Sequence, residues 1–323
     1  MEEKEQNIRY VMVSSENIQQ NVTNDEIDLR ELWKAIWQGK WLIIAVTTVC
    51  AIGAVLYALS LPNIYKSEAL LAPASSDEQA GLSGIAGQFG GLASLAGVSL
   101  GGAKADKTAL AIQILKSRQF TSQFIQKRNI LPELMAVKEW DLSSNKIIYD
   151  EAIYSPDTDK WIREAEPQED VKPSMQVAKL VFDDMFTVQQ NKDTGLVAIS
   201  VEHRSPYVAK QWVDWLIEDI NANMKVRDKQ EAERSITYLQ SQIEKTTVLE
   251  HKTLLYQLIE EQAKTLMFAE VREEYVFKTI DPALVPEIKF SPKRAIIVAF
   301  ATLLAGILGV FVVLFISLFR KQS

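Results

Sequence analysis

The sequence has 323 residues and a net charge of −7, from 42 acidic against 35 basic side chains, so it lacks the basic surface on which nucleic-acid binding depends. Hydrophobic residues make up 47% of the chain, which is enough for a folded core in addition to membrane-spanning segments. The single cysteine, Cys50, excludes an internal disulfide and a cysteine-based metal site.

The first 40 residues are interpreted as a cytoplasmic tail that ends in an interfacial helix. Residues 1–24 are polar and show no periodicity. Asp28 and Glu31 have the spacing of a helix N-cap and its capping-box partner, and apolar side chains then recur at helical spacing as far as Trp37. Tryptophan prefers the headgroup level of a bilayer. We therefore predict a helix at the membrane surface; binding of a cytoplasmic partner by the same face is the alternative.

Two long apolar runs predict transmembrane helices. Residues 41–61 and residues 295–319 contain no charged side chain, and each run is at least as long as the roughly 20 residues that span a bilayer. A secretory signal is excluded for the first run, because its 21 residues exceed a signal core of about 7 to 15 residues.

The distribution of basic residues predicts the orientation of the chain. Three basic side chains precede the first run, whereas only Lys66 closely follows it, so the positive-inside rule places the N-terminal side in the cytoplasm. Two spans then return residues 320–323 to the cytoplasm and leave residues 62–294 on the outer side, which is the periplasm in a bacterium. The basic residues before the first span are Arg30, Lys34 and Lys40.

Both predicted spans carry small residues four positions apart. Such spacing lets two helices approach closely in lipid, where packing must supply the attraction. These residues are candidates for packing between the spans or between subunits, although small residues are also common in membrane helices for no such reason. The two trios are Cys50, Ala54 and Ala58 in the first span, and Ala301, Ala305 and Gly309 in the second.

Residues 79–103 form a glycine-rich stretch with no charge and eight of the thirteen glycines. We reject a third span here because the glycines and scattered polar residues make a weak membrane sequence. A mobile loop is the simple interpretation, and a segment that lines a lumen or touches lipid is the functional one. Gly97 and Gly102 have the interval of a phosphate-binding loop, but Ala103 stands where that motif requires lysine.

The remainder of residues 62–205 predicts a mixed α/β base. A strand at residues 64–72 is followed by a helix over residues 107–128 and an acidic, proline-punctuated surface excursion at residues 140–173. Ser174 is expected to cap a helix that ends at residue 185, and a hairpin with a glycine-bearing loop follows at residues 186–202. In the first helix the residues expected to face inward are Leu110, Ile114 and Leu115.

A long helical rod is predicted for residues 206–274. Ser205 and Pro206 have the N-cap and first-turn pattern of a helix start, and residues 207–281 contain neither glycine nor proline. One helix of this length would exceed 100 Å at about 1.5 Å per residue, so we expect it to fold back at the β-branched residues 246–248. The apolar stripes expected to face each other are Ile236, Leu239 and Ile243, and Leu254, Leu258 and Leu266. They are too sparse for a core of their own, so the rod is expected to pack against other subunits.

A strand over residues 275–280 is predicted to return the chain to the base, which is completed by residues 275–294. Pro282, Pro286 and Pro292 then favour an extended and stiff connector to the second span. The predicted fold class is therefore an α+β membrane protein, in which two transmembrane helices flank a periplasmic α/β base with a long projecting helical hairpin.

No catalytic, cofactor-binding or metal-binding residue is predicted. The two histidines, His203 and His251, are separated by a whole helix and are interpreted as surface residues. Neither a catalytic triad order nor a metal-ligand spacing occurs in the sequence. A protein that works without chemistry of its own is expected.

Four short motifs occur at fixed places relative to the predicted spans. Together they resemble the chain length determinant family, the Wzz-type polysaccharide co-polymerases, and the likeness extends over nearly the whole chain from Asp25. The motifs are Glu26-Ile27-Asp28-Leu29 with Leu32-Trp33, Ile114-Leu115-Lys116-Ser117-Arg118, Ile280-Asp281-Pro282-Ala283, and Ser291-Pro292-Lys293-Arg294.

The resemblance implies a ring-shaped homo-oligomer in the bacterial inner membrane, with an α/β base on the periplasmic face and a long helix projecting outward. It implies a regulator without enzymatic activity, which sets the length of O-antigen or a related lipid-linked glycan together with the membrane-embedded polymerase.

Two alternatives stay open. Val271-Arg272 before Ile280-Asp281-Pro282 resembles the capsule and exopolysaccharide branch of the family, but Ala269-Glu270 replace the Gly-Asn typical of it. A co-polymerase that works in export with a separately encoded tyrosine kinase is therefore one alternative. A two-span periplasmic sensor or adaptor is the other, although no output module is evident.

Overall fold

The structure is a computed structural model that describes Trp33 and residues 36–74, 102–163 and 170–322. The chain divides into two compact units, Met1–Ser60 with Arg294–Ser323, and Leu61–Lys293. Most of the predicted interfacial helix and nearly all of the glycine-rich stretch at 79–103 lie outside the described residues.

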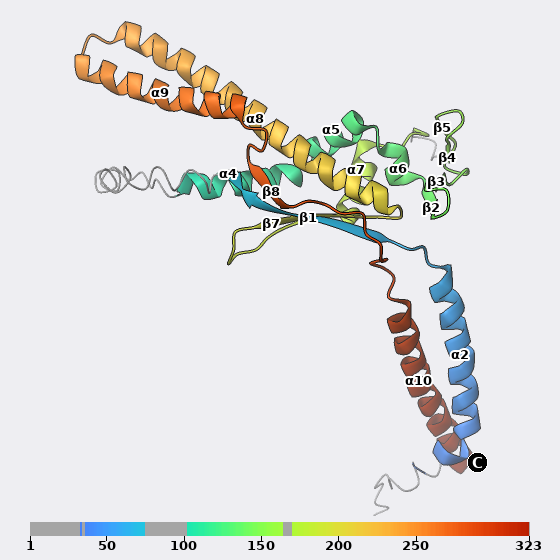
Figure 1. Cartoon of the computed structure of the whole chain (residues 1–323). Helices are drawn as coiled ribbons and strands as arrows, with labels where there is room; N and C mark the ends of the chain where they lie inside the picture. Colours follow the sequence, from blue (N-terminus) through green and yellow to red (C-terminus); the bar gives the residue numbers. More distant parts are fainter. Residues whose placement is uncertain (1–32, 34–35, 75–101, 164–169, 323) are drawn as a thin grey trace, which may run out of the picture. The chain divides into compact units, whose positions relative to one another are not determined.

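The first unit is a pair of apolar helices. Helix α2 covers Lys40–Ser60 and helix α10 covers Arg294–Gln322, in agreement with the two predicted spans. By length and composition, Lys40–Ser60 and Arg294–Ile316 are able to cross a membrane. The two helices pack along each other (Figure 1).

The second unit is built on a four-stranded antiparallel sheet in the order β6-β7-β1-β8. The inner strands are β1 (Tyr65–Pro73) and β7 (Val197–His203), and the outer strands are β6 (Phe186–Gln190) and β8 (Phe277–Asp281). Strand β8 comes from a distant part of the sequence and pairs with β1, so the first and the last strand of the unit lie side by side in the sheet. The predicted hairpin β6–β7 is confirmed, and Gly195 in its loop has a positive φ of 71°, which glycine adopts without strain.

Helices cover one face of this sheet and form the core with it (Figure 1). Helix α7 (Met175–Met185) begins as predicted at Ser174, whose hydroxyl accepts a hydrogen bond from the Val177 amide. Trp212, at the centre of the core, is fully buried. Around it pack large apolar side chains from the sheet and from four helices: Leu71, Leu115, Phe124, Phe182, Ile199 and Leu216.

The predicted helix over residues 107–128 is wrong, because the structure has two helices there. Helix α4 (Gly102–Leu115) ends before Ser117, and α5 (Arg118–Arg128) starts with the Ser117 hydroxyl accepting from the Phe120 amide at 3.2 Å. A serine side chain that competes for backbone amides favours such a new start. Within α4 the prediction for Leu110 is also wrong, since this side chain is 38% exposed.

The predicted surface excursion at residues 140–173 contains regular structure that was not predicted. Two small hairpins lie in or beside it, β2 (Val137–Asp141) with β3 (Lys146–Tyr149), and β4 (Tyr154–Ser155) with β5 (Lys160–Trp161). Packed aromatic rings hold the second hairpin, with the Tyr154 and Trp161 centroids 5.1 Å apart and the ring planes tilted by 51°. Between the two helices and these hairpins lies a short helix, α6 (Leu131–Met135), which has Pro132 in its first turn.

The helical hairpin agrees closely with its prediction. Helix α8 (Pro206–Lys245) begins at the Ser205 cap, and α9 (Leu249–Val271) returns after the expected break at residues 246–248. The predicted contact face of α9 is partly wrong, because Leu254 is 56% exposed and Leu258 is 39% exposed. The buried or half-buried apolar positions of α9 are Leu255, Ile259, Leu266, Phe268 and Ala269.

Candidate functional site

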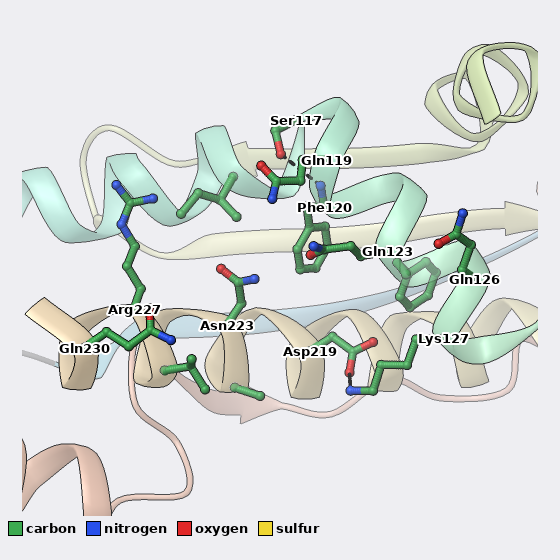
Figure 2. Close-up of a pocket in the computed structure, with 14 residues that line it drawn as sticks. Ser117, Gln119, Phe120, Gln123, Gln126, Lys127, Asp219, Asn223, Arg227 and Gln230 are labelled. Atoms are coloured by element: carbon green, nitrogen blue, oxygen red, sulfur yellow. Dashed lines mark hydrogen bonds and ion pairs between the residues drawn. The ribbon is translucent and has the colours of Figure 1, made fainter.

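A groove of the second unit lies between α5 and α8. Its volume is about 660 Å³, within the range of about 300–1,000 Å³ that is usual for ligand sites. Figure 2 shows that it has one wall from α4 and α5 and a facing wall from α8. This groove was not predicted from the sequence.

The α5 wall carries three glutamines on one helical face. Gln119, Gln123 and Gln126 are spaced four and three residues apart, which places them in one row along the helix. All three are exposed and line the groove. Beneath them, Phe120 and Phe124 are buried in the core, so the row of amides is presented on a firmly packed helix.

The α8 wall repeats this spacing. Asn223, Arg227 and Gln230 are again four and three residues apart, and they line the groove opposite the glutamines (Figure 2). Val226, which is 54% exposed, adds an apolar surface between them. Two rows of polar side chains with one spacing therefore face each other across the groove.

An ion-pair cluster closes one end of the groove and joins its walls. Asp219 of α8 accepts from Lys127 Nζ at 2.6 Å and from Arg128 Nε and Nη2 at 3.1 and 2.7 Å. The Arg128 guanidinium also lies over the Trp215 ring, 5.1 Å from its centroid. Hydrogen bonding to Asp219 raises the pKa of Arg128, against the opposing effect of burial. The two-pronged contact fixes the end of α5 on α8.

Six other polar side chains of the groove have no partner in the part of the chain that the structure describes. The side chains of Gln119, Gln123 and Gln126 make no hydrogen bond there, and neither do those of Asn223, Arg227 and Gln230. Each amide offers both a donor and an acceptor. The groove thus presents a mixed set of free donors and acceptors to any polar ligand.

A second polar cluster lies inside the base, around His203. The prediction of a surface histidine is wrong, because His203 is 2% exposed. The Ser205 amide donates to its Nδ1 at 2.9 Å, so Nε2 carries the proton and donates to the Glu133 carbonyl oxygen at 3.0 Å. Trp212 Nε1 donates to the Glu133 carboxylate at 3.2 Å.

Burial perturbs both titratable groups of this cluster. It lowers the pKa of His203 to about 4, and it raises the pKa of Glu133, which the hydrogen bond from Trp212 partly opposes. Because the cluster fixes Ser205, which caps α8, and its His203 and Trp212 side chains are buried, its role is to hold the start of α8. Among the described residues, no group of histidine, cysteine and acidic side chains is arranged to hold a metal ion.

The predicted helix-packing residues are divided between two environments. Ala58 and Ala305 are 1% and 4% exposed, and Gly309 faces Ile43, whose Cα would lie 3.3 Å from a Cβ at this position. A Cβ on Gly39 would overlap the Val313 side chain, so residue numbers rise along α2 as they fall along α10 and the helices are antiparallel. Ala54 and Ala301 are half-buried, whereas Cys50 is exposed. The role of the trios in assembly stays a prediction.

The proline connector lies along the first strand of the sheet. The Ile64 amide donates to the Ser291 carbonyl at 2.9 Å, and the Phe290 amide donates to the Ile64 carbonyl at 2.9 Å. Further along, the Ser67 hydroxyl donates to the Leu284 carbonyl at 2.7 Å. These bonds hold the chain around Pro286 and next to Pro292, while Pro282 lies at the end of β8. That the connector transmits position to the second span stays a prediction.

Comparison with known protein families gives a match over part of the chain. Residues 25–128 match the family model described as Wzz, chain length determinant protein. No curated protein sequence gives a significant match.

Two solved structures are similar to this chain. One is a full-length bacterial polysaccharide co-polymerase, at 15% identity and a TM-score of 0.40, with 93% of this chain and 99% of that chain covered. The other is a fragment of WzzB, a polysaccharide co-polymerase from Salmonella Typhimurium, at 13% identity and a TM-score of 0.31, with 71% of this chain and 100% of that one covered.

Proposed function

We propose that this chain, whose residues 25–128 match the chain length determinant family, belongs to that family and regulates the length of O-antigen or a related lipid-linked glycan. It does so with the membrane-embedded polymerase that elongates the glycan, and without chemistry of its own. The match to the family is the observation that carries this proposal. The pair of apolar helices at the ends of a mixed α/β body supports it.

The proposed place of action is the bacterial inner membrane. Proteins of this family are inner-membrane proteins with two spans that flank a periplasmic domain, and α2 and α10 have the length and composition for such spans. Both termini are proposed to be cytoplasmic, because the basic residues cluster before α2.

The chain is proposed to act as a ring of identical subunits. In the part of the helical hairpin beyond Met224, only Ala232 and Ala269 are buried. Large apolar side chains of α9 are exposed there. A surface of this kind is typical of a contact that a single subunit leaves uncovered. The exposed side chains are Leu249, Leu254, Tyr256, Leu258, Met267 and Val271.

The length distribution of surface polysaccharide tests the proposed function. A strain without the chain is expected to lose its preferred glycan length on a gel, and restoration of the wild-type chain is expected to recover it. Analysis of O-antigen and exopolysaccharide from the same cells identifies which polymer depends on the chain. An unchanged distribution of every surface polysaccharide in the deletion strain would refute the proposal.

A further inference from the structure

We propose that the groove between α5 and α8 binds a short segment of the polysaccharide whose length the protein regulates. The inference rests on the proposed function and adds a binding site to it. The contacts would come from the amides of Gln119, Gln123 and Asn223 and from the Arg227 guanidinium.

The first argument is the repeated spacing of the two walls. The three polar residues of each wall span seven helical positions, or about 10 Å at about 1.5 Å per residue. A compact metabolite needs a few converging groups, whereas two facing rows suit a ligand that extends along the groove. A polymer of similar units has this shape.

The second argument is chemical. A sugar ring presents neighbouring hydroxyl groups, each of which is both a donor and an acceptor. Amides have the same dual capacity within one rigid plane, and the amides of the groove have no partner in the described part of the chain. The Arg227 guanidinium adds donors only. Because it is charged, its hydrogen bonds to hydroxyl or acidic oxygens are stronger than those of a neutral donor. The lining therefore matches a hydroxyl-rich chain better than an apolar peptide.

The third argument is that the site is formed before ligand binds. Helix α5 is held by the Ser117 cap at its start and by the Asn129 cap, with φ 52°, at its end. Asp219 joins it to α8 through Lys127 and Arg128. A rigid site loses little conformational freedom on binding, so several modest hydrogen bonds suffice for a measurable but reversible affinity. Reversible contact suits a glycan that must still be elongated.

The experiment uses the full chain in lipid nanodiscs and a defined probe. Short fragments released by mild acid from the surface polysaccharide of the wild-type cells are titrated against the protein and followed by calorimetry. We expect saturable binding that the triple variant Gln119→Ala, Gln123→Ala, Asn223→Ala weakens by about tenfold or more. Arg227→Ala alone is expected to weaken it by a smaller factor.

Matched control residues are available on α4 and on α8. Gln113 on α4 and Gln211 on α8 are exposed and lie outside the groove lining, so Gln113→Ala and Gln211→Ala are expected to leave the affinity within about twofold of wild type. All of the replaced side chains are exposed or half-buried polar groups, and unchanged thermal unfolding verifies that the variants fold.

The mass of the protein particle distinguishes a groove that binds glycan from a groove that a second copy of the chain covers. Loss of affinity in the groove variants with an unchanged particle mass supports the inference. Absence of fragment binding to wild type, or equal affinity in the triple variant, overturns it. A triple variant of altered particle mass also overturns it, since the groove would then be covered by a second copy of the chain. None of these results depends on the length distribution in the deletion strain, which tests the proposed function separately.

Discussion

The two halves of helix α8 share one backbone but differ in what surrounds them. Of its eleven buried residues, ten lie between Pro206 and Met224, and the other is Ala232. The first half is enclosed by the sheet and by α4 to α7, whereas the second half contacts α9 (Figure 1). The first half is thus part of the core. The second half and α9 (Leu249–Val271) form a helical hairpin, which we call the arm.

This difference shows where the stability of the domain resides. Burial of large apolar side chains is the main favourable contribution to folding, and in α8 it is concentrated near Trp212. Helices stabilised mainly by exposed hydrogen bonds open locally at lower free energy than core elements. We therefore expect the base to fold as an independent body and the arm to depend on contacts with other subunits.

The largest effect is expected from loss of the central core side chain. Trp212 is fully buried and lies against Phe182, with ring centroids 6.2 Å apart. Trp212→Ala is expected to lower the free energy of unfolding by about 3–5 kcal/mol, because it leaves a cavity and an unpaired Glu133 carboxylate. Chemical denaturation of the detergent-solubilised chain measures this. A loss below about 1 kcal/mol would contradict the assignment of the base as the stable half.

An effect of about 2–3 kcal/mol is expected from pH acting on His203. Burial lowers its folded pKa to about 4, below the ordinary value of 6.5, so the unfolded chain takes up the proton first as the pH falls. The contribution of His203 is fully present above about pH 6.5 and is lost as the pH falls to about 4. Glu133 acts in the opposite direction, because its raised pKa lets the folded chain take up a proton first.

The variant His203→Gln isolates the histidine contribution. Glutamine offers an acceptor and a donor as the neutral imidazole does, but it does not titrate. Its unfolding free energy is expected to fall less steeply than that of wild type between pH 6.5 and 4. Parallel curves for the two proteins would show that the buried ring does not control acid stability.

A smaller effect is expected where α5 is attached to α8. Asp219 is 6% exposed and accepts from two cations, of which Arg128 is 16% exposed and Lys127 is 59% exposed. Asp219→Asn is expected to cost about 1–3 kcal/mol, since the partly buried Arg128 then keeps only its ion pair with the exposed Glu218. Hydrogen exchange is expected to increase in α5 more than in α9. Equal exchange in α5 of both proteins would contradict the proposal that the ion pairs of Asp219 fix α5 on α8.

The smallest effect is expected in the arm. Leu255 is half-buried on α9, and Leu255→Ala is expected to cost about 1 kcal/mol or less, because the truncated site is partly open to water. Faster hydrogen exchange is expected to be confined to α9 and the distal half of α8. Faster exchange throughout the base would instead show that arm and base unfold as one body.

The elements that the sequence predicts best are those with strong local signals. The Ser205-Pro206 start, the break at residues 246–248 and the two apolar runs each depend on a few adjacent residues, and the structure has all of them. The split between α4 and α5 depends on one serine cap and was missed. The burial of His203 depends on β7, α6 and α8 meeting in space, which no local pattern shows.

The groove was missed for a related reason. Its two rows share one helical spacing, and this signal is present in the sequence at residues 119–126 and 223–230. Exposed amides at such spacing are common on helices, however, and only the packing of α5 on α8 turns two ordinary faces into facing walls. The prediction of facing stripes on the arm failed at Leu254 and Leu258 because a sparse apolar pattern fits more than one rotation of a helix.

The most direct test of this account is the length distribution of surface polysaccharide from three strains, run side by side at matched protein levels. The strains lack the chain, carry the wild-type chain, or carry the Gln119→Ala, Gln123→Ala, Asn223→Ala variant. We predict a broad distribution without the chain, a preferred length with wild type, and a shifted or weakened preference with the variant. A deletion strain whose distribution superimposes on that of wild type would contradict the central claim.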